Sequence, residues 1–131
     1  MTDQKHTLES LFSDAGPFDE SAVIKAIFPF VTIQKSTSEI FLKESNLTNE
    51  EKVLVFALAK KLLKAKSLIK TDMITALEVH KKTGIKKGTI DPVFMGLKGK
   101  GFLVGKKEYE IPVIKIPQII KLINPKTDNH E

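Results

Sequence analysis

The stretch from Val53 to Leu63, VLVFALAKKLL, is apolar nearly all the way round a helix. Thr48 and Glu51 precede it with the spacing of a capping box, which predicts a helix over residues 48–66. Such a helix is buried on most sides, or it pairs with a second copy of itself. Lysines gather near its C-terminal end, where the helix dipole favours cations: Lys60, Lys61, Lys64 and Lys66.

The chain has 131 residues and no cysteine. That length suits one domain with a small additional lobe. The lack of cysteine excludes disulfides, thiolate metal sites and cysteine nucleophiles, and it fits a reducing compartment. No run approaches the ~18 apolar residues of a membrane helix, and no signal-peptide pattern opens the chain. We therefore expect a cytoplasmic protein that does not contact a membrane.

Residues 1–46 read as an acidic lobe that contains two short helices and a β-hairpin. The first helix is expected over residues 6–14 and the second over residues 19–28, each ended by proline or a Gly-Pro pair. Apolar and polar residues then alternate on both sides of a polar KSTS loop, which is typical of a hairpin. The apolar positions of its two arms are Val31, Ile33, Ile40 and Leu42.

A short strand, two helices and a hairpin are expected after the apolar helix. Asp72–Ile74 is the candidate strand, and Thr75 with Glu78 repeats the capping-box spacing before a helix that ends at Lys82. Gly84 stands where a left-handed helix end is needed. The next helix is predicted over residues 87–98, with Ile90, Phe94 and Leu97 facing inward and Lys87, Gly88, Asp91, Pro92, Met95 and Lys98 facing outward.

The C-terminal third is predicted to hold a hairpin and one more helix. Strands at Phe102–Val104 and Tyr109–Ile111 flank a tight turn at Gly105–Glu108. Pro117 suits the first turn of a final helix over Gln118–Ile123, and the residues from 124 form a polar tail.

Residues 48–111 resemble a winged helix-turn-helix domain. TALEVHKKTGI is similar to the positioning helix and turn, KKGTIDPVFMGLKGKGFLV to the recognition helix and first wing strand, and GKKEYEI to the wing. The resemblance implies a mostly α fold with a small β wing, of the α+β class. Residues 47–123 would form that domain, residues 1–46 an N-terminal helical and β-hairpin extension, and residues 124–131 the tail.

The charge of the chain is strongly uneven. The net charge is +5, yet residues 1–51 carry four lysines against nine acids, and residues 81–107 carry eight lysines against Asp91 alone. Such a basic block is typical of a polyanion site, although a solvated lysine surface gives the same count. Every basic residue is lysine, which binds phosphate as a point charge but lacks arginine's planar fork for reading bases.

The resemblance implies that the basic block contacts double-stranded DNA, mainly through the phosphate backbone. Lys86 and Lys87 stand at a helix start, where free amides already favour an anion, and Lys106 and Lys107 stand at the wing tip. Pro92 either kinks the recognition helix or marks its true start. The expected DNA-binding residues are Lys81, Lys82, Lys86, Lys87, Thr89, Lys98, Lys100, Lys106 and Lys107.

The leading hypothesis is a small DNA-binding regulator or architectural protein that acts as a homodimer. The apolar helix and the last helix are the expected dimer seams, and the acidic lobe is a candidate cover for the basic face. The alternative is a winged-helix module for protein–protein assembly, whose hairpin at residues 31–42 adds a strand to a partner. We expect no enzyme, cofactor or metal site, because no catalytic motif occurs and His80 reads as a surface or partly buried helix residue.

Overall fold

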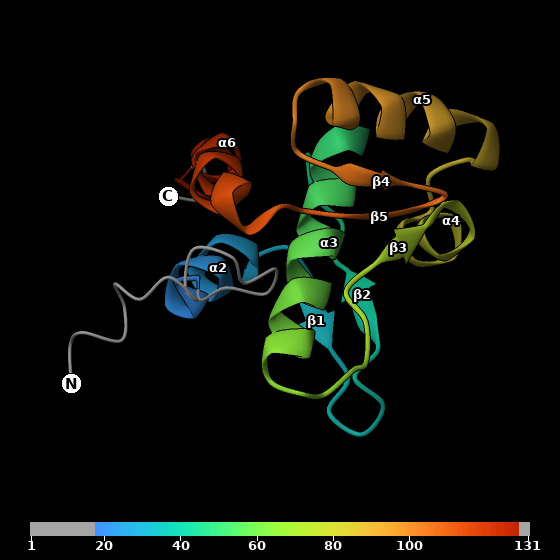
Figure 1. Cartoon of the computed structure of the whole chain (residues 1–131). Coiled ribbons are helices and arrows are strands. Elements are labelled where there is room, and N and C mark those ends of the chain that lie inside the picture. The colour runs from blue at the N-terminus through green and yellow to red at the C-terminus, as the bar shows by residue number, and fades with distance from the viewer. Residues whose placement is uncertain (1–17, 129–131) are drawn as a thin grey trace, which may run out of the picture.

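The computed structural model describes residues 18–128, with side chains described as far as residue 124. The predicted helix over residues 6–14 lies outside the described residues. The described part is a mixed α and β fold of five α-helices and two small antiparallel sheets (Figure 1). The helices are α2 (Glu20–Ile27), α3 (Asn49–Ala65), α4 (Ala76–Thr83), α5 (Lys87–Gly99) and α6 (Ile116–Asp128). The strands are β1 (Val31–Ile33), β2 (Ile40–Leu42), β3 (Ile74–Thr75), β4 (Val104–Lys106) and β5 (Glu108–Glu110), and a 3₁₀ turn, η2 (Val113–Lys115), precedes α6.

Helix α3 passes through the middle of the molecule and is covered by the other elements (Figure 1). The predicted capping box is confirmed: Glu51 N donates to Thr48 Oγ1 at 3.2 Å, and Thr48 N donates to Glu51 Oε1 at 2.9 Å. Every residue from Val53 to Leu63 is buried within the single chain. The expectation that the apolar stretch of this helix serves as a dimer seam is therefore wrong, because residues 53–63 leave no exposed side for a second copy.

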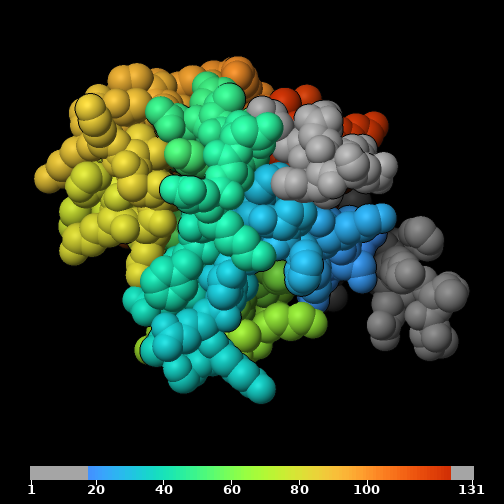
Figure 2. Space-filling model, turned by 180° about the vertical axis from the view of Figure 1, so that it is seen from behind, coloured from blue at the N-terminus to red at the C-terminus, as the bar shows by residue number. Residues whose placement is uncertain are grey.

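The hairpin formed by β1 and β2 belongs to the same core as α3. Phe30 and Ile40 are buried in one continuous apolar cluster with the residues of α3 and α5. Figure 2 shows the hairpin and the segment after it (teal to green) lying between α2 (blue) and the α4–α5 pair (yellow). A boundary at residue 46 therefore does not separate two hydrophobic cores, and removal of the whole first lobe would open the interior.

The second sheet has the strand order β3-β5-β4. Its hairpin is confirmed, but the strands extend further toward the turn than predicted, because Gly105 pairs with Tyr109 and only Lys107 (φ 57) links the two strands. A Cβ at position 105 would lie 2.0 Å from the Glu108 carbonyl oxygen, so this close turn requires glycine. The third strand lies at Ile74–Thr75 rather than at 72–74, because Asp72 is used in a buried ion pair instead.

Helices α4 and α5 are joined by a tight turn. Gly84 adopts the predicted left-handed conformation (φ 80), and the Nδ1 of His80 lies 2.8 Å from the Ile85 carbonyl oxygen across the turn. Helix α5 starts at Lys87 and continues through Pro92, so the alternative start at Pro92 is not what forms.

Helix α6 is longer than predicted and lies beside α2 (Figure 1). It begins at Ile116, directly after η2, and reaches Asp128 rather than ending at 123. Ile116, Ile119 and Ile123 turn one face inward and are almost fully buried. This face is covered within the chain, so only the opposite face of the helix remains available to a second copy.

Candidate functional site

The outer face of α5 is the face that the sequence predicts. Its three inward residues, Ile90, Phe94 and Leu97, are buried with at most 1 % of their surface exposed. The predicted outward residues are all exposed: Lys87, Gly88, Asp91, Pro92, Met95 and Lys98. The 3.6-residue period was sufficient here because a helix lying on a core must bury one stripe.

One stripe of α5 faces an open groove, which we name the α5 groove. Lys87, Asp91, Met95 and Lys98 repeat at helical spacing, so they lie along the same side of α5. Asp91 and Met95 line the groove opposite the β4–β5 hairpin, which contributes Lys106, Lys107, Glu108 and Tyr109. Thr75 of β3 and Ala76 and Leu77 of α4 also line the groove, which has a volume of about 970 Å³.

The floor of the α5 groove is aromatic. The rings of Phe94 and Tyr109 pack with their centroids 4.7 Å apart. Lys98 Nζ lies 5.9 Å from the centre of the Tyr109 ring, a distance at which a cation is attracted to the ring face. Tyr109 therefore joins the hairpin to α5 and places Lys98 on the hairpin side of the helix.

Lysines lie in the α5 groove and on the stripe of α5 that continues from it. Lys106 and Lys107 line it from the hairpin, and Lys87 lies one turn before Asp91 on the same stripe of α5. These three lysines, and also Lys81 and Lys86, form no ion pair with the described side chains of residues 18–124. All five are exposed, so their ammonium groups are open to a ligand.

Two of the predicted DNA-binding lysines are held by acids instead. Lys82 Nζ donates to Glu39 Oε2 at 2.8 Å, and Lys100 Nζ donates to Glu50 Oε1 at 2.6 Å. Lys82 also lies 5.5 Å from the ring of Phe41, so it is directed toward the β1–β2 hairpin. The structure therefore does not bring all nine predicted residues together, and Thr89 is half-buried.

Two apolar side chains at the α5 groove were not identified as a pair from the sequence. Leu77 is 51 % exposed and Met95 is 52 % exposed, and both line the groove. They come from different helices, so no sequence spacing relates them. An apolar pair beside lysines permits contact with a hydrophobic partner as well as with an anion.

The lysines near the end of α3 have a structural role that the sequence pattern missed. Lys61 Nζ lies 2.8 Å from Asp72 Oδ2, and both side chains are about 95 % buried. Lys60 Nζ donates to the Met73 carbonyl oxygen at 2.8 Å and to Glu78 Oε2 at 2.9 Å. These contacts join α3 to β3 and α4. Protein oxygens thus take the place of water around the two buried ammonium groups.

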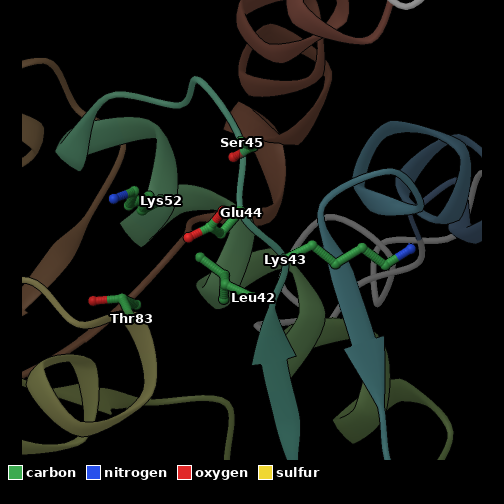
Figure 3. Close-up of a pocket in the computed structure, with 6 residues that line it drawn as sticks. All are labelled: Leu42, Lys43, Glu44, Ser45, Lys52 and Thr83. Atoms are coloured by element: carbon green, nitrogen blue, oxygen red, sulfur yellow. The ribbon is translucent and has the colours of Figure 1, made fainter.

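Other features of the described residues offer less. A polar hollow of about 510 Å³ contains side chains of both charges, including Lys43, Glu44 and Lys52 (Figure 3). No group of three or more histidines and acids that could hold a metal ion occurs among the described side chains of residues 18–124. None of the helices that the structure describes is both long and apolar enough to cross a membrane. No protein-family model matches the chain, and no match was found among curated proteins or solved structures.

Proposed function

We propose that residues 48–111 form a winged helix-turn-helix, as the sequence resemblance implies. The order α3, β3, α4, α5, β4, β5 supports this assignment, as does the pairing of β3 with β5 rather than with its neighbour in sequence. In this assignment α4 is the positioning helix, α5 is the recognition helix and the β4–β5 hairpin is the wing.

The function that this geometry supports best is binding of double-stranded DNA through its phosphates. The observation that carries the proposal concerns three exposed lysines that form no ion pair with the described side chains of residues 18–124. Lys106 and Lys107 line the α5 groove, and Lys87 lies one helical turn before Asp91, which also lines it. Asp91 and Glu108 lie in the same groove and repel phosphate, so the proposed contact is made by these lysines and not by the rest of the groove. We expect a modest sequence preference, because every basic residue is lysine, and we propose no catalytic role. Homodimer formation and a cytoplasmic location stay predictions.

A fluorescence-anisotropy titration with a labelled 20-base-pair duplex tests the proposal. If four lysines meet phosphates, the logarithm of the binding constant falls with the logarithm of salt with a slope of about −4. Lys86→Glu with Lys87→Glu should weaken binding more than tenfold and flatten that slope by about 2. A flat salt response of the wild-type protein, or no binding at low salt, contradicts the proposal.

A matched control changes two exposed lysines that lie outside the α5 groove. Lys25 on α2 and Lys35 in the β1–β2 loop are exposed and form no ion pair within the described residues. Lys25→Glu with Lys35→Glu changes the net charge by the same amount. Binding that drops equally in both double variants would indicate a general charge effect and not a site.

The second candidate is a module for protein–protein assembly, and exposed Leu77 and Met95 favour it. Met95→Lys distinguishes the two candidates. An added cation in the groove should tighten DNA binding if phosphate passes over α5, whereas it should abolish docking of an apolar partner. Unchanged DNA binding in this variant would place the phosphate contact away from Met95, whereas no DNA binding by either protein together with loss of partner docking in the variant would favour the assembly module.

A further inference from the structure

Strand β1 has an open edge with unpaired backbone groups. It pairs with β2 in the register Val31 to Leu42 and Ile33 to Ile40. The bonds from Lys43 N to Phe30 O and from Gln34 N to Glu39 O, both 2.8 Å, flank this ladder. Because such bonds alternate along an antiparallel pair, the N–H and C=O groups of Val31 and Ile33 point away from β2. No third strand pairs with that edge among residues 18–128.

An apolar groove of about 320 Å³ runs along this open edge. Strand β1 forms one side with Val31, Thr32 and Ile33, and α2 forms the other with Ile24, Ile27 and Phe28. Phe28 is 70 % exposed and Ile24 is 44 % exposed. Natural sheets usually protect an exposed edge with charge, proline or a covering element. Here the side next to the free backbone groups is instead lined by large apolar side chains, which is the environment that an added strand requires.

The groove has a cation and no acid. Lys43 lines it, and its Nζ lies 5.6 Å from the centre of the Phe28 ring. Figure 3 shows Lys43 reaching toward α2, away from the other five labelled residues of the polar hollow. Lys43 forms no ion pair in the described part of the chain. A second copy would bring another edge without an acid, so its Lys43 would also stay unpaired.

We propose that this edge binds an extended segment of another protein, with apolar side chains at alternate positions and an acidic end placed at Lys43. The segment adds a third strand beside β1: its backbone pairs with Val31 and Ile33, and alternate side chains enter the groove against Phe28 and Ile24. This site is on a different part of the molecule from the α5 groove, and it does not depend on DNA binding.

Fluorescence anisotropy with the full chain tests the proposal. The probe is a labelled peptide that alternates valine with threonine and ends in two glutamates. The matched control peptide has the same side chains but carries N-methyl groups on the amides that would face β1. The first peptide should bind saturably, and the methylated peptide should bind at least about tenfold more weakly, because each lost backbone bond costs about 1 kcal/mol. No binding at about 1 mM peptide overturns the proposal.

Substitutions of exposed residues test whether the peptide binds at the β1 edge, and they leave the hydrophobic core unchanged. The Lys43→Glu variant should bind a peptide that ends in two lysines more tightly than the peptide that ends in two glutamates. The Phe28→Ser variant should bind both peptides more weakly than the wild-type protein does. Amide hydrogen exchange at Val31 and Ile33 should slow when the first peptide is added. An unchanged preference in Lys43→Glu overturns the charge assignment.

Two further outcomes would assign the groove to another occupant. A dimer in sedimentation equilibrium, with the amides of Val31 and Ile33 protected before peptide is added, would mean that a second copy fills it. Binding that occurs only after residues 1–17 are removed would mean that the chain's own N-terminal segment fills it. Either result overturns the proposal of a separate partner.

Discussion

The lysines of α3 and the lysines at the α5 groove have the same side chain but opposite surroundings. Lys60 and Lys61 lie inside the fold, each within 3 Å of a carboxylate oxygen. Lys87, Lys106 and Lys107 lie outside and form no ion pair with the described side chains of residues 18–124. Composition records both sets as the same positive charge, yet only the second is free to attract a polyanion. Net charge therefore overstates the surface available for binding.

The largest expected effect is loss of a buried acid. Asp72→Ala leaves the ammonium group of Lys61 buried without its main partner, so the variant should lose about 3–5 kcal/mol of unfolding free energy. Glu110, at 3.4 Å from Lys61 Nζ, is the remaining partner and is too exposed to replace Asp72. Urea denaturation followed by circular dichroism measures the loss.

The control removes both charges together. Lys61→Met with Asp72→Leu replaces the pair by apolar side chains of similar volume, which is often neutral or stabilising. This double variant should therefore be more stable than Asp72→Ala. Equal instability in both would show that the pair contributes through its shape and not through its charge.

An intermediate effect is expected when the exposed lysines near the α5 groove are replaced. DNA binding should change, and stability should not. Replacing Lys86, Lys87, Lys106 and Lys107 by glutamine should change the unfolding free energy by no more than about 0.5 kcal/mol, because exposed charges contribute little. DNA affinity at 50 mM salt should fall about 100-fold or more, with a salt slope close to zero. A stable variant that still binds DNA with the wild-type slope would place the phosphate site elsewhere.

Regular periodicity was enough to predict most elements of this fold. The capping residues Thr48 and Thr75, the left-handed Gly84 and the inward stripe of α5 are local patterns, and local geometry fixes them. The partners of Lys61 and Lys82 are not local. Asp72 is 11 residues from Lys61 and Glu39 is 43 residues from Lys82, so only the packed fold brings them together.

The same limit applies to the candidate sites. The α5 groove combines residues of α4, α5 and the β4–β5 hairpin, and its Leu77–Met95 pair crosses two helices. The sequence predicted the lysines of this region but could not separate the free ones from Lys82 and Lys100, whose acids lie in other elements. The free edge of β1 follows from the alternation of the hairpin, whereas the groove beside it depends on where α2 packs.

The smallest expected effect comes from the ion pair between Glu39 of the acidic lobe and Lys82 of the predicted DNA-binding set. Glu39→Gln removes the partner of Lys82 without deleting the hairpin, whose Phe30 and Ile40 belong to the core. Stability should change by less than about 0.5 kcal/mol, because both side chains are partly exposed. DNA binding at low salt should tighten about two- to threefold as Lys82 becomes free, and the gain should vanish at high salt. Glu39→Gln combined with Lys82→Gln is the control and should show no gain; a gain that survives in this pair would mean that Glu39 repels DNA directly and does not act by holding Lys82.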